Sequence, residues 1–174
     1  MLVRLWKSFL NRVIQIVVQV APGERNFRPF LHRMRGVKIG KNCGIARDAI
    51  IETAYPNLVS IGDGSYIGIG VIITAHFRDE PSMEDRFKKE TVSVNIEKDV
   101  LIGPGSIIMP HLTIGEGSVI SAGSVVTRSV PAKMLMQGNP AEPVARCGIP
   151  LAPLSTTVRE FYRNLKPLKS GKGS

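Results

Sequence analysis

Aliphatic residues recur at every sixth position through the second half of the chain. This series consists of Ile96, Ile102, Ile108, Ile114, Ile120 and Val126, and shorter series with the same step occur at Ile39, Ile45 and Ile51 and at Ile61, Ile67 and Ile73. A six-residue step matches neither the 3.6-residue period of a helix nor a long, flat strand. It predicts short strands that meet at repeated turns, three to a triangular coil. Stacked coils would pair their strands in parallel and bury the aliphatic column.

Two insertions interrupt this repeat. Ile51 and Ile61 lie ten residues apart, and the segment between them contains a proline and an asparagine, so we expect a small insertion at a corner. Ile73 and Ile96 lie 23 residues apart, and nine charged residues occur between Arg78 and Glu90. So many charges are too costly for a core. The pattern predicts a loop, at about residues 76–92, that is ejected into solvent or over a neighbour.

The N-terminal segment predicts an amphipathic helix that ends at Pro22-Gly23. Its apolar positions recur at three- and four-residue steps: Leu2, Leu5, Trp6, Phe9, Val13, Ile16, Val17 and Val20. The segment lacks the run of about 20 apolar residues that a transmembrane helix needs, and its polar residues extend too far for a signal peptide. Peripheral contact of residues 1–20 with an anionic membrane is one interpretation. Packing on its own protein or on a neighbouring subunit is the other.

The distribution of charge and cysteine restricts the class of protein further. The net charge is +9, yet residues 1–41 alone contain nine Lys and Arg against one acid, Glu24, and the middle of the chain is slightly acidic. A nucleic-acid-binding face is therefore not expected. Cys43 and Cys147 lie far apart without metal-ligand spacing, which favours a reduced, cytoplasmic protein that can lie against the inner face of the membrane.

The stretch VNIEKDVLIGPGSIIMPHLTIGEGSVISAGSVVTRSVPAKMLMQGNPAEPVAR resembles the hexapeptide-repeat acyltransferases, in particular the maltose, galactoside and polysaccharide-biosynthesis O-acetyltransferases. The resemblance covers roughly residues 37–146 and implies an all-β fold, a left-handed parallel β-helix. Its left hand follows from the resemblance and not from the periodicity. Residues 1–36 then form the helix and a basic lead-in. Residues 147–174 form an extension with a short, Ser/Thr-capped helix and a flexible basic tail.

His76 is the candidate catalytic residue, because it lies at the root of the predicted loop. In family members that acetylate sugars, the resemblance implies, a histidine at this place acts as general base on the acceptor hydroxyl. Imidazole suits this role because its unperturbed pKa is about 6.5. A carboxylate or carbonyl should orient its second ring nitrogen, and Asp79, Glu80 and Glu84 are candidates. His111 and His32 are interpreted as structural and non-catalytic.

Acetyl-CoA is the acyl donor that the resemblance implies, in a groove between two subunits of a homotrimer. The residues that correspond to its contacts are Gly103, Pro104, Ala122, Gly123, Thr127 and Arg128. Two departures from the family pattern concern this region. Leu101 stands where the family usually has an aromatic residue. Glu142 stands where the family usually has a basic residue, and Arg146 is the candidate to make the phosphate contact of that basic residue.

The sequence thus predicts an acetyl-CoA-dependent O-acetyltransferase that acts on a sugar hydroxyl, in surface polysaccharide biosynthesis. N-acylation of an amino sugar, or acetylation of a small metabolite such as serine, remains open on the same scaffold. So does a non-catalytic β-helix used in assembly or at a membrane. A zinc enzyme of this fold needs three histidine ligands, and only His76 and His111 could contribute, so no metal is expected.

Overall fold

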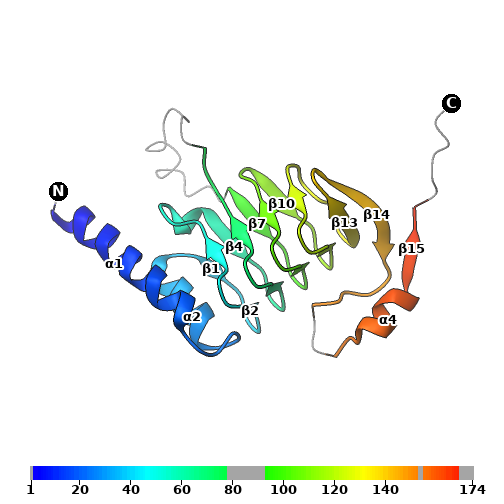
Figure 1. The fold of residues 1–174 in the computed structure, drawn as a ribbon, viewed down its shortest axis with the longest axis horizontal. Helices are drawn as coiled ribbons and strands as arrows, with labels where there is room; N and C mark the ends of the chain where they lie inside the picture. Colours follow the sequence, from blue (N-terminus) through cyan, green and yellow to red (C-terminus); the bar gives the residue numbers. More distant parts are fainter. Residues whose placement is uncertain (1, 78–92, 153–154, 169–174) are drawn as a thin grey trace.

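The chain forms two N-terminal helices, a three-sided coil of short strands and a C-terminal cap, arranged in that order along the molecule (Figure 1). The structure is a computed structural model that describes residues 2–77, 93–152 and 155–168, with the backbone alone for residues 2–8. The first helix, α1 (Leu2–Val20), agrees with the predicted amphipathic helix.

Each turn of the coil passes through three sheets. The first face contains β1 (Lys38–Ile39), β4 (Val59–Ile61), β7 (Val94–Ile96) and β10 (Leu112–Ile114). The second contains β2 (Gly44–Ile45), β5 (Tyr66–Ile67), β8 (Leu101–Ile102) and β11 (Val119–Ile120), and the third contains β3 (Ile50–Ile51), β6 (Ile72–Ile73), β9 (Ile107–Ile108) and β12 (Val125–Val126). All these strands pair in parallel with the strand one coil away.

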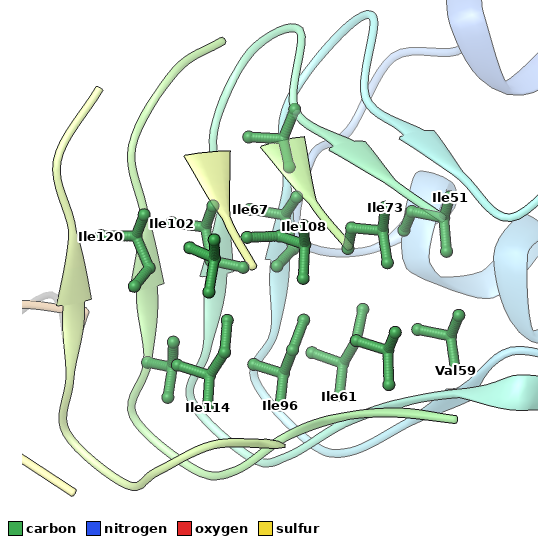
Figure 2. Close-up of a cluster of buried hydrophobic side chains, with 14 of the residues drawn as sticks. Ile51, Val59, Ile61, Ile67, Ile73, Ile96, Ile102, Ile108, Ile114 and Ile120 are labelled. Atoms are coloured by element: carbon green, nitrogen blue, oxygen red, sulfur yellow. The ribbon is translucent and has the colours of Figure 1, made fainter. Parts of the chain in front are cut away.

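An aliphatic column runs along the inside of each face (Figure 2). On the second face Ile102 pairs with Ile67 on one side and with Ile120 on the other. All three side chains are 0% exposed. From Ile102 to Ile120 the chain advances by 18 residues, which is one coil of three hexads. The predicted repeat is confirmed, and burial of its aliphatic side chains supplies the main stabilisation of the coil.

Both insertions occur at the same corner, between the third face and the first. Ile51 pairs with Ile73, 22 positions later, and the additional residues include a 3-10 turn, η1 (Pro56–Leu58). Ile61 pairs with Ile96, 35 positions later. Most of the loop predicted at residues 76–92 lies outside the described residues. Because each insertion begins and ends at a corner, the strands on both sides of it keep their register.

A second helix, α2 (Phe27–Arg35), precedes the coil and was not predicted from the sequence. It contains Pro29, although proline usually argues against a helix. In α2 it lies in the first turn, where its missing N–H has no helical partner to lose. The helix ends at Gly36, whose φ of 107° is left-handed and favours glycine.

The coil ends in an antiparallel hairpin of β13 (Met134–Gly138) and β14 (Ala141–Cys147), with β15 (Leu165–Pro167) alongside β14. Between β14 and β15 lies α4 (Val158–Arg163), and the predicted Ser/Thr cap is confirmed at Thr157, which exchanges hydrogen bonds with Glu160. Phe161 packs on Val119 and Cys147, with Leu101 beside them. Leu101 therefore contacts the C-terminal cap, on the second face of the coil.

We expect Ile102→Ala to lower the free energy of unfolding by about 2–5 kcal/mol, because the substitution leaves a cavity between two buried isoleucines that cannot collapse onto it. The matched control is Ile69→Ala, since Ile69 is 51% exposed and lies in an adjacent coil. It should cost less than about 0.5 kcal/mol. Urea denaturation measures both values, and equal losses for the two variants would contradict the packing described for the column.

Candidate functional site

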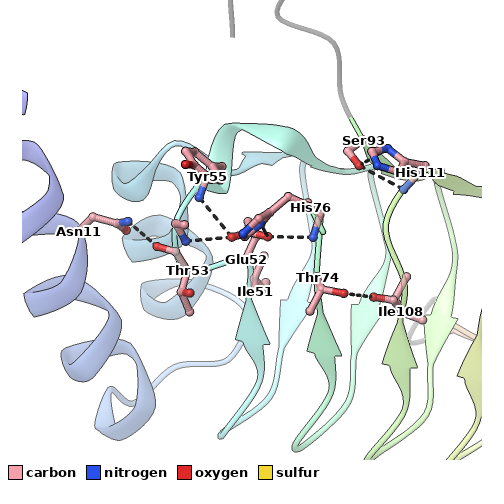
Figure 3. A network of polar contacts seen from close by, with 12 residues as sticks. Asn11, Ile51, Glu52, Thr53, Tyr55, Thr74, His76, Ser93, Ile108 and His111 are labelled. Atoms are coloured by element: carbon pink, nitrogen blue, oxygen red, sulfur yellow. Dashed lines mark hydrogen bonds and ion pairs between the residues drawn. The ribbon is translucent and has the colours of Figure 1, made fainter. Parts of the chain in front are cut away.

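The turns that follow β3, β6 and β9 carry three ionisable residues of interest, Glu52, His76 and His111 (Figure 3). We call this edge of the coil the histidine corner. It is the corner at which both insertions leave the repeat. The parallel strand pairing stacks these turns, so residues far apart in sequence become neighbours.

Glu52 and His76 form a hydrogen-bonded pair at this corner. Oε2 of Glu52 lies 2.9 Å from Nδ1 of His76 and accepts a second hydrogen bond, of 2.8 Å, from the N–H of Ala75. The other carboxylate oxygen accepts from the N–H groups of Ala54, at 2.8 Å, and Tyr55, at 3.2 Å. The Glu52 side chain is 2% exposed and that of His76 is 28% exposed. A buried, fully hydrogen-bonded carboxylate therefore supports an imidazole that solvent can reach.

These contacts determine the ionisation of Glu52 and the tautomer of His76. Burial alone would raise the pKa of Glu52, but the hydrogen bonds from Ala75, His76, Ala54 and Tyr55 outweigh burial and lower it. An ionised carboxylate can only accept, so Nδ1 of His76 carries the proton that it donates. The lone pair of the neutral ring is then on Nε2, the nitrogen available to act as a base.

Tyr55 restrains the same imidazole from a second direction. Its ring meets that of His76 edge to face, with the centroids 5.0 Å apart and the planes at 87°. This is a favoured geometry for two aromatic rings. The small insertion after β3 therefore contributes both the carboxylate and an aromatic contact to His76.

The partner of His76 was not found from the sequence. The three candidates, Asp79, Glu80 and Glu84, lie outside the described residues. Glu52 precedes His76 by 24 residues, but the pairing of Ile51 with Ile73 brings its turn beside that of His76. The available signal was an acidic residue directly after a buried isoleucine, one coil before the histidine.

Behind Glu52 lies a second polar layer that connects it to both N-terminal helices. Nη2 of Arg35 donates to the carbonyls of Ile51, at 3.1 Å, and Glu52, at 2.8 Å. Nε of Arg35 donates to Oδ1 of Asn11 at 2.7 Å, and Nδ2 of Asn11 donates to the carbonyl of Thr53 at 2.7 Å. Residues of α1 and α2 thus hold the turn that carries Glu52.

His32 belongs to this layer and stays neutral. Its Nδ1 lies 3.1 Å from Nη1 of Arg35, and because guanidinium only donates, Nδ1 must accept. Burial, and then the charge of Arg35, lower the pKa of His32 to about 3. Its interpretation as non-catalytic remains a prediction, and its position beneath α1 and α2 suits a structural role.

His111 lies at the same corner one coil beyond His76. Its backbone is left-handed, with a φ of 62°, and its Nδ1 lies 3.0 Å from the hydroxyl of Ser93, which also accepts from the His111 N–H at 3.1 Å. Such contacts close a tight turn, which favours the structural interpretation. Within residues 2–77, 93–152 and 155–168, no three His, Cys, Asp or Glu side chains gather as a metal site would require.

The residues that correspond to acetyl-CoA contacts occupy two different corners. Gly103, Pro104, Ala122 and Gly123 stack at the corner between the second and third faces, where the N–H of Gly123 donates to the carbonyl of Pro104 at 2.9 Å. A Cβ at Gly103 would lie 2.5 Å from the backbone nitrogen of Ala122, so close stacking alone already requires this glycine. Pro104, Ala122 and Gly123 are exposed and can meet a ligand.

Thr127 and Arg128 instead follow β12, at the histidine corner. Arg128 forms an ion pair with Glu142, and both side chains are more than half exposed. An exposed pair of this kind is weak, so a phosphate could replace the carboxylate. Arg146 lies four residues further along β14 and pairs with Met134, whereas Glu142, the partner of Arg128, pairs with Gln137.

Comparisons with known proteins identify relatives along most of the chain. The family profile described as bacterial transferase hexapeptide (six repeats) matches residues 93–128. A Bacillus subtilis protein assigned as an acetyltransferase, YvoF, is 33% identical over 132 residues, which cover 72% of this chain and 71% of that protein. The galactoside O-acetyltransferase of Lactococcus lactis is 30% identical over 113 residues, which cover 64% of this chain and 55% of that protein.

Two further relatives match to different extents. A protein of Escherichia coli K12 assigned as a colanic acid biosynthesis acetyltransferase is 29% identical over 133 residues, with 66% of this chain and 72% of that protein covered. A Schizosaccharomyces pombe protein assigned as an acetyltransferase is 51% identical over 53 residues, but the match spans only 26% of that protein and 30% of this chain.

Solved structures share the fold at low sequence identity. A hexapeptide-repeat acetyltransferase of Vibrio cholerae, complexed with acetyl-CoA, has a TM-score of 0.59 at 23% identity, with 80% of this chain and 86% of that chain covered. A galactoside acetyltransferase in complex with coenzyme A has a TM-score of 0.59 at 21% identity, with 80% of each chain covered. The predicted fold class, a left-handed parallel β-helix of hexapeptide repeats with an N-terminal helix, is confirmed.

The burial of His32 predicts a defined dependence of stability on pH. The pKa of His32 is about 3 in the folded chain, against an ordinary value of 6.5. Between these two pH values His32 is therefore protonated in the unfolded chain and neutral in the folded chain. The contribution of neutral His32 is therefore complete above pH 6.5 and is lost as the pH falls, by about 1.4 kcal/mol per pH unit. Urea denaturation between about pH 5 and 7 measures this slope.

His32→Gln is the matched variant, because glutamine can accept from Arg35 without titrating. The pKa of Glu52 is lowered from 4.5, so its own contribution is lost only below that value and does not enter this window. We expect the slope to be shallower in the variant than in the wild type. Parallel slopes would contradict a neutral, buried His32.

Proposed function

Since the chain belongs to the hexapeptide-repeat acetyltransferase family, we propose that it transfers the acetyl group of acetyl-CoA to a sugar hydroxyl, with His76 as the general base. The observation that carries this proposal is the contact between Nδ1 of His76 and the buried Glu52 carboxylate, at 2.9 Å. A buried charge destabilises the folded protein unless it is paired and hydrogen-bonded. The Glu52 carboxylate accepts hydrogen bonds from three backbone N–H groups and contacts a partly exposed imidazole. This arrangement suits catalysis better than stability alone.

The reaction begins when Nε2 of His76 accepts the proton of the acceptor hydroxyl as its oxygen attacks the thioester carbonyl of acetyl-CoA. A new C–O bond forms, and the carbonyl electrons move to oxygen, where backbone N–H groups of the coil would stabilise the charge. The intermediate collapses, the C–S bond breaks, and the imidazolium of His76 returns the proton to the departing thiolate. Glu52 remains ionised throughout and stabilises the imidazolium.

Acetyl-CoA binding is proposed to require two subunits. Ala122 and Gly123 lie at the corner between the second and third faces, whereas His76 lies at the corner between the third and first. In one chain the whole third face separates them. A homotrimer in which this corner of one subunit meets the histidine corner of the next would bring the groups together, in agreement with the subunit-boundary site that the resemblance implies.

A sugar unit of a surface polysaccharide or of its precursor is the proposed acceptor. Two relatives support it through their names, the galactoside O-acetyltransferase of Lactococcus lactis and the Escherichia coli protein assigned to colanic acid biosynthesis. An amino sugar or a serine-like metabolite would use the same base. Parallel assays with neutral sugars, amino sugars and serine separate these alternatives, since thiol release from acetyl-CoA reports each one.

We expect His76→Ala to lower kcat by about 100- to 10,000-fold, because the acceptor hydroxyl loses its base. Glu52→Gln should lower kcat by at least about 100-fold. Its amide can donate to Nδ1 and so moves the ring proton to Nε2, the wrong nitrogen for a base. Steady-state kinetics with a sugar that the wild type acetylates measure both effects. KM for acetyl-CoA should change little.

His111→Asn is the matched control, because asparagine tolerates the left-handed backbone at this position and His111 contacts Ser93 rather than Glu52. It should retain most of the activity. Stabilisation of each variant by acetyl-CoA in a thermal melt confirms that the fold and the donor site persist. A folded His76→Ala protein with full activity would exclude the mechanism. Absence of any acetyl-CoA binding by the wild type would instead favour a non-catalytic β-helix.

A further inference from the structure

Helix α1 presents to the outside the apolar stripe that its sequence defines. The stripe consists of Phe9, Val13, Ile16, Val17 and Val20, with Phe9 60%, Ile16 66% and Val20 81% exposed. The opposite side of the helix packs on the protein through Ile14 and Val18, which are buried with Leu31 of α2. Asn11 and Gln15 also lie on this inward side and are partly buried. The more polar side thus faces the protein, and Val13, Ile16, Val17 and Val20 of the stripe are 39–81% exposed.

The inward side of α1 is held by hydrogen bonds as well as by the buried Ile14 and Val18. Asn11 donates to the carbonyl of Thr53 and accepts from Arg35, each at 2.7 Å. Rotating the helix to bury the stripe would break both hydrogen bonds at the turn that carries Glu52. The outward direction of the stripe is therefore a stable property of the fold, and an exposed run of apolar side chains along one helix suits an interaction site.

Basic side chains surround this end of the molecule. Arg12 is exposed on α1, and Arg25, Arg33 and Lys41, with two asparagines, line an open cavity of about 590 Å³ beside α2. On α2 itself Phe27, Phe30 and Met34 are 44–56% exposed. The single acid of residues 1–41, Glu24, already accepts a hydrogen bond from the hydroxyl of Tyr66. Asp63 is a second acid beside this group, since its Oδ1 accepts a hydrogen bond from the N–H of Lys41 at 2.6 Å. Arg12, Arg25, Arg33 and Lys41 still outnumber these two acids, so apolar and cationic groups occur together.

Charge decides which partner such a surface fits. A second copy of this end would bring like charges together, which is unfavourable. An anionic lipid surface instead attracts each Lys or Arg by about 1 kcal/mol and accepts apolar side chains below its headgroups. In the described part of the chain no helix is long and apolar enough to cross a bilayer. Insertion in the plane of the interface agrees with this limit.

We propose that the end of the molecule formed by α1 and α2 binds the surface of an anionic phospholipid bilayer, with the α1 stripe inserted among the headgroups and the basic residues against lipid phosphates. This binding does not depend on acetyl transfer. It would hold the histidine corner close to the membrane surface, since Asn11 connects α1 to the turn of Glu52.

Vesicle flotation with the full-length protein tests the proposal. The wild type should bind phosphatidylcholine vesicles that contain about one-third phosphatidylglycerol and should bind pure phosphatidylcholine at least about ten-fold more weakly, with the difference reduced by salt. Ile16→Glu combined with Val20→Glu should weaken binding at least about ten-fold. Arg12→Gln and Lys41→Gln should each weaken binding to the anionic vesicles by about five-fold, because each removes one positive charge from this end of the molecule.

Val158→Glu is the matched control, because Val158 is 60% exposed on α4, at the opposite end of the molecule (Figure 1). It should bind like the wild type, and thermal melts should show that all variants are folded. Equal binding by the Ile16→Glu/Val20→Glu variant and the wild type would overturn the proposal, as would equal affinity for neutral and anionic vesicles. A wild-type assembly that sedimentation shows to be larger than that of this variant would also overturn it, because a second copy would then cover the stripe.

Discussion

Stacking of isoleucines from successive coils is the constraint on which the rest of the structure depends. The strands of the coil, β1 to β12, are only two or three residues long, so none is stable alone, and each is held by its pairing with a strand one coil away. Once Ile67, Ile102 and Ile120 occupy one column, the positions of every turn between the strands are determined as well. Side chains at a corner are therefore held with the precision of the core beneath them.

The candidate site makes use of this precision. The turn after β3 contributes Glu52 and Tyr55, and the turn after β6 contributes His76, because both turns follow paired isoleucines. Insertions are tolerated at this corner since the chain enters and leaves it in register. One insertion provides the carboxylate and the aromatic contact, and the other begins directly after the histidine. The residues at this corner, and with them the proposed acceptor substrate, can thus change while the coil stays unchanged.

The N-terminal helices connect two functions that the sequence presents separately. Arg35 and Asn11 hold the Glu52 turn from behind, and the same Asn11 fixes the rotation of α1 that leaves its apolar stripe outward. The proposed membrane contact and the position of the proposed base are therefore joined through one hydrogen-bonded layer. His32 contributes to this layer in its neutral form, which burial beside Arg35 favours.

The amino-acid sequence by itself determined the coil, its aliphatic columns, the two insertions, the α1 helix and the Thr157 cap, because each of these depends on periodicity or on contacts between residues close in the chain. It also singled out His76, through the break in the repeat. Helix α2 was not predicted, and the structure shows that it accommodates Pro29 in its first turn. Only the tertiary structure decided that Glu52 is the partner of His76, that Arg128 meets Glu142, and that α1 turns its polar side inward. The physical reason is the same in each case: these contacts join residues 14 to 42 positions apart, and only the stacking of complete coils and the docking of helices upon them bring such residues together.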